Sequence, residues 1–150
     1  MKAVIQRVAQ ASVTMKETGE RRAIGAGMVT LLGIAPGDTE RDAAWLADKL
    51  GNLRIFEDEA GKMNRSIREI PKGAMLIISQ FTLLGETRQG RRPSFTGAAA
   101  PDIARPLYET LVRLVRESNL TVQTGDFGAD MQVEIVNDGP VTLIVETPSF

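Results

Sequence analysis

Residues 28–53 read MVTLLGIAPGDTERDAAWLADKLGNL, and this stretch contains the strand, the turn and the helix that decide the fold. Its first seven residues are mostly apolar and predict a buried β-strand, which Pro36-Gly37-Asp38 ends. Thr39 then stands at the N-cap of a predicted helix, with Asp42 three residues later. The helix presents one apolar stripe at helical spacing, formed by Ala43, Leu46, Ala47, Leu50 and Leu53.

Strand-like segments outnumber helical ones in the rest of the chain and do not alternate regularly with them. Residues 2–15 alternate apolar and polar side chains, which predicts one bent strand or two short ones. A second helix is predicted to begin at Pro101, with Pro106 near its first turn. We therefore predict an α/β protein with a mixed sheet, or two sheets, and two helices packed on one side. Further strands are predicted at residues 75–78, 120–124, 131–136 and 141–146, and a hairpin at residues 54–64.

Length and polarity indicate one ordinary globular unit. The 150 residues predict a single domain over positions 1–150, because the sequence contains no linker and no internal repeat. The segment Met1–Arg7 turns polar too early for a signal peptide, and no apolar run approaches the ~20 residues that cross a bilayer. We therefore expect a cytoplasmic protein with no membrane partner.

Two residue types are missing from the sequence, and their absence excludes several kinds of catalytic and metal site. The chain has no cysteine and no histidine, which excludes disulfides, a thiolate nucleophile, a Ser-His-Asp triad and the usual zinc sites. Gly25-Ala26-Gly27 does not fit a dinucleotide-binding loop, because Thr30 stands at the third glycine position and a strand follows. We therefore predict no metal site and no cofactor, so that any chemistry uses carboxylates, hydroxyls, Lys or Arg, or the backbone.

Charge is unevenly distributed along the chain. Residues 60–92 hold seven basic and two acidic side chains, a net charge of +5, whereas the remaining residues sum to −6. A basic segment in an otherwise acidic protein indicates a phosphate-bearing partner, although a solvated loop has the same composition. Both interpretations stay open on charge alone.

Two short motifs lie where strands are predicted to end. Ser79-Gln80-Phe81-Thr82 follows a buried strand, and its hydroxyls either act on a substrate or satisfy backbone groups. Asn137-Asp138-Gly139-Pro140 joins two predicted strands, and Asp-Gly favours a hairpin turn. The proline removes the amide that would rejoin the ladder, so this motif is either a plain turn or a rigid loop with outward carbonyls.

Taken together, the ordered motifs of the chain resemble the D-aminoacyl-tRNA deacylase family, and the resemblance covers essentially all residues. These motifs are Met1–Val8, Leu53–Phe56, Gly61–Asn64, Ser79–Leu83, Arg92–Phe95, Thr124–Ala129 and Asn137–Thr142. The resemblance implies a three-layer α/β/β fold and a homodimer with two active sites at the subunit interface. It also implies hydrolysis of the ester that joins a D-amino acid, or glycine, to tRNA.

The resemblance assigns roles to both short motifs. Ser79, Gln80, Phe81 and Thr82 are expected to form the floor of the catalytic pocket, where backbone amides near Phe81 and Thr82 bind the oxyanion. The 2′-hydroxyl of the terminal adenosine, rather than a protein side chain, is expected to assist the reaction. Gly139-Pro140 is expected to contain a cis peptide bond and to reach into the partner's pocket. The remaining expected substrate-binding residues are Asn137 and Phe95.

The basic segment supplies candidate tRNA contacts, and two other functions remain as alternatives. The candidates for phosphate binding are Lys62, Arg88, Arg91 and Arg92. One alternative is an esterase with Thr82 as nucleophile, which lacks an obvious base to deprotonate the hydroxyl. The other is a module that binds the end of an RNA without cleaving it.

Overall fold

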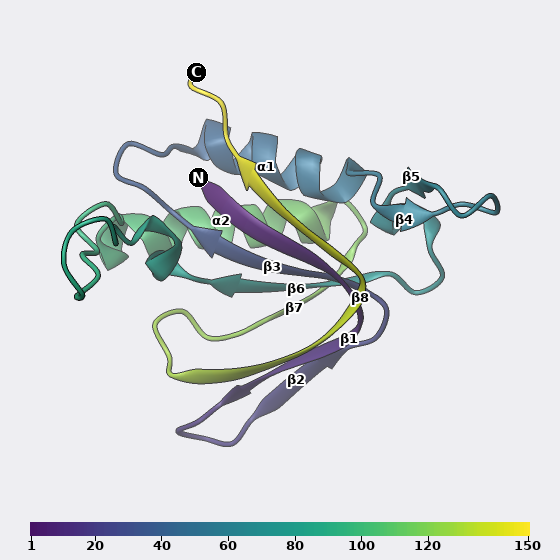
Figure 1. Cartoon of the computed structure of the whole chain (residues 1–150), viewed down its shortest axis with the longest axis horizontal. Helices are drawn as coiled ribbons and strands as arrows, with labels where there is room; N and C mark the ends of the chain where they lie inside the picture. Colours follow the sequence, from purple (N-terminus) through teal and green to yellow (C-terminus); the bar gives the residue numbers. More distant parts are fainter.

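The computed structural model describes all 150 residues and contains one curled, mixed sheet with two helices on one side (Figure 1). The strand order is β2-β1-β3-β6-β7, and β8 pairs with β1 as a further strand. The strands of this sheet are β1 (Lys2–Met15), β2 (Arg21–Ile24), β3 (Gly27–Gly33), β6 (Ala74–Ser79), β7 (Thr121–Thr124) and β8 (Met131–Glu146). The other elements are α1 (Glu40–Asn52), α2 (Pro101–Glu117), the short helices η1 (Ile67–Glu69) and η2 (Phe81–Leu84), and a small hairpin of β4 (Phe56–Glu57) and β5 (Met63–Arg65).

The sheet is mixed because the two helices act as crossovers between parallel strands. α1 lies in the chain between β3 and β6, and α2 lies between β6 and β7; both of these strand pairs are parallel. β1 pairs antiparallel with β2, β3 and β8. The predicted mixed α/β fold with two helices is therefore confirmed. Neither helix has the length and apolar composition that crossing a membrane requires.

Alternate residues of the central strands face two separate apolar cores. Met75 and Ile77 of β6 pack in the larger core with both helices, whereas Leu76 and Ile78 belong to a smaller core on the opposite face. The smaller core is completed by Val13 and other residues from the far half of β1, together with Ile24 of β2. The sheet therefore curls until it is nearly barrel-like, and its central strands are buried on both faces.

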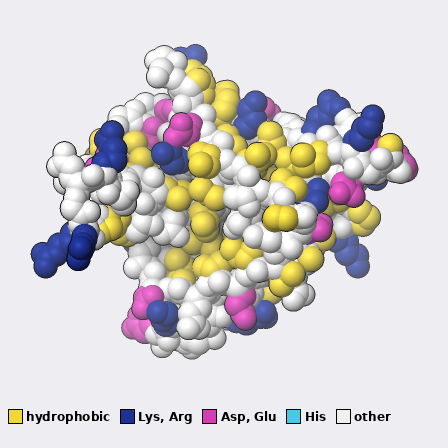
Figure 2. Space-filling model, viewed as in Figure 1, with side chains coloured by type: hydrophobic (Ala, Val, Ile, Leu, Met, Phe, Trp, Pro, Cys, Tyr) yellow, Lys and Arg dark blue, Asp and Glu magenta, His cyan; other side chains and the backbone are white.

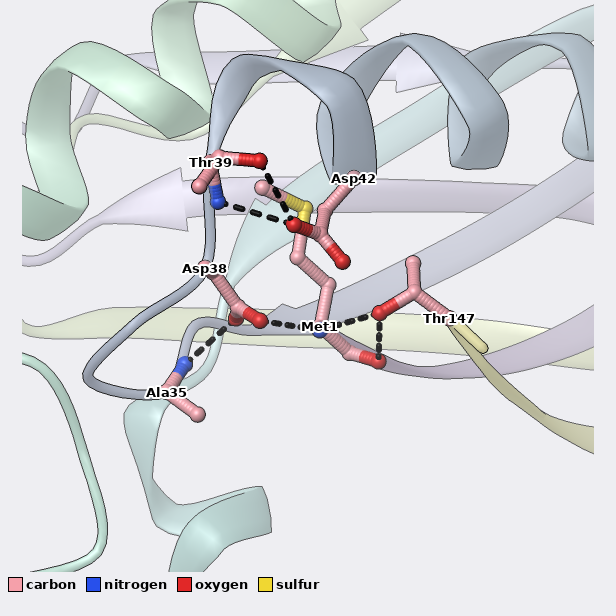
Figure 3. A network of polar contacts seen from close by, with 6 residues as sticks. All are labelled: Met1, Ala35, Asp38, Thr39, Asp42 and Thr147. Atoms are coloured by element: carbon pink, nitrogen blue, oxygen red, sulfur yellow. Dashed lines mark hydrogen bonds and ion pairs between the residues drawn. The ribbon is translucent and has the colours of Figure 1, made fainter. Parts of the chain in front are cut away.

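The N-terminal amino group joins the start of β1 to the turn before α1 (Figure 3). It belongs to the buried residue Met1 and lies 2.7 Å from Asp38 Oδ1 and 2.7 Å from Thr147 Oγ1. Asp38 also accepts a hydrogen bond from the Ala35 amide, so this carboxylate closes the turn as well. The predicted cap of α1 is present, because the amide and hydroxyl of Thr39 both donate to Asp42 at 2.9 Å.

Two local predictions need correction. Residues 131–137 and 142–146 do not fold back on each other as an Asp-Gly hairpin; both pair with β1 as parts of β8, and residues 138–141 form an irregularity between them. Pro106 lies in the second turn of α2 rather than near its first turn. β6 ends at Ser79, and the chain then forms the short helix η2.

Candidate active site

A mostly apolar cavity of about 600 Å³ opens where the parallel strands end and α2 begins. Carboxyl ends of parallel strands are common ligand sites, because the loops that follow them converge there. The ends of β3 and β6, the first residues of α2 and the connection between β7 and β8 all contribute to the wall. The lining residues are Leu32, Ile34, Ile78–Phe81, Phe95, Ala98–Pro101, Ala104, Phe127–Met131 and Val133.

Four of the predicted site residues come together in this cavity. Ser79, Gln80 and Phe81 line it from the end of β6, and Phe95 lines it from the 85–97 loop. The Gln80 amide donates to the Leu32 carbonyl at 2.7 Å, which fixes the start of η2 against β3. The rings of Phe81 and Phe95 meet edge to face with centroids 5.2 Å apart. Thr82 lies next to these residues but does not line the cavity.

The backbone at the start of η2 offers unpaired hydrogen-bond donors. The amides of Phe81 and Thr82 donate no hydrogen bond within the chain, whereas those of Leu83 and Gly85 bond to Gln80 and Thr82 carbonyls. The first amides of a helix have no internal partner and favour negative charge. Two donors are therefore free beside an apolar cavity, which is the arrangement that an oxyanion requires.

The Thr82 hydroxyl is not placed as an activated nucleophile. Its one side-chain partner is the side-chain nitrogen Nε2 of Gln80, which donates a hydrogen bond to the hydroxyl and cannot accept its proton. No carboxylate or lysine contacts this hydroxyl, so the structure provides no base that would deprotonate it. In addition, no group of three or more metal-ligating side chains occurs in the structure.

A buried arginine holds the Gly139-Pro140 motif, and sequence reasoning did not identify it. The Gly139-Pro140 bond is cis, and Gly139 has a φ of +123°. Arg7, only 5% exposed, donates from Nε to the Asp138 carbonyl at 3.1 Å and from Nη1 to the Ile55 carbonyl at 2.8 Å. The sequence did contain a signal for this arginine, because Arg7 is a charged residue at the point where the alternation of apolar and polar side chains in β1 is interrupted.

Within one chain, the Gly139-Pro140 motif is separate from the cavity. Asn137, Gly139 and Pro140 are absent from its lining. Ser79 pairs with Leu32, and Leu32 pairs with Ala3 of β1, whereas Arg7 holds the motif. Ala3 and Arg7 are four positions apart on β1, which corresponds to about 13 Å along the strand. The two predicted halves of the site are therefore not assembled by a single subunit.

The four candidate tRNA contacts fall on two distant surfaces. Arg88, Arg91 and Arg92 lie in the 85–97 loop at one end of the molecule, and Lys62 lies in the β4–β5 hairpin at the other (Figure 1). Arg88 contacts Glu86, and this hydrogen-bonded guanidinium lowers the pKa of the Glu86 carboxyl. Neither Arg91 nor Arg92 has an ion-pair partner in the structure. The basic segment of the sequence is thus not one continuous patch.

Sequence comparison identifies the family. The sequence model described as D-Tyr-tRNA(Tyr) deacylase matches residues 4–146. A D-aminoacyl-tRNA deacylase of Geobacter sulfurreducens is 56% identical over 149 residues, covering 99% of this chain and 97% of that protein. A D-aminoacyl-tRNA deacylase of Thermotoga petrophila is 51% identical over 150 residues, covering 98% of this chain and 97% of that protein.

Two solved structures share the fold of this chain. The structure of a c-Myc DNA unwinding element binding protein superposes with a TM-score of 0.88 at 41% identity, covering 99% of this chain and all of that one. A probable eukaryotic D-amino acid tRNA deacylase superposes with a TM-score of 0.81 at 19% identity over 96% of this chain and 97% of that one, which shows the shared fold. From its sequence and its relatives, this chain belongs to the D-Tyr-tRNA(Tyr) deacylase family of enzymes.

Proposed function

We propose that this enzyme hydrolyses the ester between a D-amino acid, or glycine, and the terminal adenosine of tRNA. Water adds to the ester carbonyl, the bond to the ribose oxygen breaks, and that oxygen takes up a proton. The products are a free amino acid and uncharged tRNA. The observation that carries the proposal is the pair of unpaired amides at Phe81 and Thr82 beside an apolar cavity of about 600 Å³.

The proposed mechanism uses the backbone and the substrate rather than a protein nucleophile. The two amides receive the carbonyl oxygen as it becomes negatively charged, and one such donor contributes about 3 kcal/mol. The neighbouring 2′-hydroxyl of the adenosine assists when it is held against the ester, and good orientation contributes up to about 7–11 kcal/mol. An aminoacyl ester is already activated, so the chain needs no histidine, cysteine or metal for this reaction.

Selection of D over L substrates is proposed to depend on Gly139-Pro140 from a second subunit. A rigid loop on the L side of the α-carbon clashes with every L side chain and leaves D side chains and glycine free. Gly139 permits a close approach because it lacks a Cβ, and Pro140 fixes its own φ. Because the motif does not line the cavity of its own chain, its action requires a partner.

The outer face of β8 is the surface that we propose to bury in a homodimer. Val136 and Ile144, which are 48% and 68% exposed, point to this face, because their neighbours Ile135 and Val145 pack against the cores. Figure 2 shows hydrophobic side chains gathered over the middle of this face, where β1 and β8 lie in front, with charged side chains mainly around the edge. An apolar, weakly charged centre with a polar rim is typical of subunit interfaces.

The tRNA is proposed to contact the basic 85–97 loop, which supplies Phe95 to the cavity. Arg91 and Arg92 are the unpaired cations there, whereas Arg88 is paired with Glu86. Each lost phosphate contact should reduce the slope of log K against log salt by roughly one unit. Lys62 provides an informative comparison, because it is separated from this loop within one chain. Binding of tRNA that does not depend on salt would contradict the proposal.

The decisive experiment measures hydrolysis of D-, L- and glycyl-tRNA by the wild type and by a Gly139→Ala variant. The wild type should cleave the D and glycyl esters and spare the L ester. In the variant, the new Cβ would lie 2.9 Å from Val141 Cγ2 and 3.0 Å from Arg7 Nη2, so the loop must shift. Comparable cleavage of D and L esters by the wild type would overturn the selection mechanism. Protection of all esters would indicate an RNA-end binding module instead.

A further inference from the structure

A second hollow lies directly beside the candidate catalytic cavity. It has a volume of about 500 Å³ and runs between α2 and the segment from Thr124 to Phe127. Phe127 lines both hollows, and neighbouring α2 residues divide between them, with Ala104 in the catalytic cavity and Arg105 in the second hollow. We call this hollow the α2 groove. A ligand that leaves the catalytic cavity past Phe127 therefore enters the α2 groove.

Ion pairs inside the α2 groove leave two arginines without carboxylate partners. Arg113 pairs with Glu117 at 2.9 Å, and Arg22 pairs with Asp126 at 3.0 Å, so these acids are already neutralised. Arg105 and Arg116 line the groove, are exposed, and form no ion pair. Glu109 is the one unpaired acid among the lining residues. The unpaired side chains of the groove therefore carry a net positive charge.

The two free arginines are arranged along one face of α2. They are 11 residues apart, which is close to three helical turns and about 16 Å along the axis. The Arg105 guanidinium lies over the Phe127 ring at 4.7 Å from its centroid, so the ring holds the charge at the boundary of the two hollows. This geometry provides one cation next to the catalytic cavity and a second farther along the same path.

We propose that the α2 groove binds the phosphates of the single-stranded RNA that precedes the aminoacylated nucleotide, with Arg105 and Arg116 as the phosphate contacts. The inference rests on the proposed function, because it takes the terminal adenosine to occupy the adjacent cavity. A guanidinium is suited to phosphate oxygens because it presents several N–H donors in one plane. A flexible single strand can follow the groove, since its backbone is not constrained by a duplex.

The test uses Arg105→Gln, Arg116→Gln and the double variant, with Arg41→Gln as the control for loss of one exposed positive charge outside the groove. Arg41 lies on α1 over the Phe150 ring and does not line either hollow. Affinity for uncharged tRNA is measured as a function of salt. Loss of two single-strand contacts should lower the log–log slope by about 1.4. The difference in affinity between the wild type and the double variant should then be roughly sevenfold larger at 50 mM than at 200 mM salt.

Kinetics provide a second readout. The double variant should raise KM for D-aminoacyl-tRNA far more than it lowers kcat, and the defect should disappear with D-aminoacyl-adenosine, which has no phosphate.

Glu109→Gln should act in the opposite direction and tighten tRNA binding, because it removes the unpaired acid of the groove. A double variant with the same salt slope and KM as Arg41→Gln would overturn the inference while leaving the deacylase proposal intact. Absence of wild-type ester cleavage would instead refute the proposed function, and the salt slopes would still report on the groove.

Discussion

Replacement of Arg7 should destabilise the fold and disturb the Gly139-Pro140 motif together. Its side chain is 6% exposed and donates to two backbone carbonyls, those of Asp138 and Ile55. Hydrogen bonds from a charged donor contribute about 1.5–3 kcal/mol each to the free energy of unfolding. Their loss leaves both carbonyls without a hydrogen-bond donor. Arg7→Met should therefore lower the free energy of unfolding by about 3–5 kcal/mol.

The predicted loss is large enough to separate from ordinary surface effects. For a chain of this length, 1 kcal/mol corresponds to about 2–4 °C in Tm, so Arg7→Met should unfold roughly 10 °C below the wild type. Arg7→Lys keeps the charge, but a single ammonium group cannot reach both carbonyls as the planar guanidinium does. We therefore expect a loss of stability between those of the wild type and Arg7→Met. Arg21→Met is the control, because Arg21 is 58% exposed and lies 3.8 Å from its partner Glu134; its effect should stay below about 1 kcal/mol.

Two assays read out the Arg7 variants. Urea unfolding followed by circular dichroism gives the change in stability, and cleavage of paired D- and L-aminoacyl-tRNAs gives the selectivity. If Arg7 positions the motif, the Arg7→Lys variant should remain folded but should cleave the L ester faster than the wild type does. An Arg7→Met variant with wild-type stability and unchanged D-to-L selectivity would refute this reasoning.

Three further predictions address the site, the core and pH. Thr82→Ala should retain most deacylase activity, because the amide and not the hydroxyl is proposed to act; a loss beyond about a thousandfold in a folded variant would favour the covalent mechanism. Thr30→Val should stabilise the protein by about 1 kcal/mol in urea unfolding, since the buried Thr30 hydroxyl has no hydrogen-bond partner; destabilisation would show that it has an unseen one. Burial raises the pKa of Tyr108 to about 12, and its hydroxyl donates to the Ile77 carbonyl at 2.9 Å. Because the raised pKa favours the neutral form in the fold, this stabilisation is complete below pH ~10 and lost between about 10 and 12. Tyr108 is the single tyrosine of the chain, so tyrosinate absorbance should show a native midpoint near 12, and a midpoint near 10 would contradict the burial effect.

Hydrophobic periodicity and capping residues were sufficient to predict most regular elements. The apolar run at 28–34, the stripe of α1 and the Thr39–Asp42 cap all appear at the expected positions, because these signals depend on contacts a few residues apart. The order of motifs was also sufficient to predict the family, which the sequence comparisons confirm.

Features that depend on distant pairing could not be predicted from local sequence. Asp138-Gly139 favours a hairpin locally, yet β1 is long enough to pair with the chain on both sides of the motif, so β8 continues past it. Likewise, residues 60–92 form one basic segment in the sequence, but the fold places Lys62 and the 85–97 loop at opposite ends of the molecule (Figure 1).

The sequence alone therefore determined the elements, the family and the absence of histidine and cysteine chemistry. Only the tertiary structure showed that Arg7 is buried beneath Gly139-Pro140, that the amides of Phe81 and Thr82 are unpaired, and that the motif lies away from its own cavity. The physical reason is that these properties belong to segments that lie far apart in the chain, such as Arg7 and Asp138, which are 131 residues apart, or to backbone groups that carry no side-chain signature. Their energies depend on which strands are neighbours, and strand order is a property of the whole folded chain.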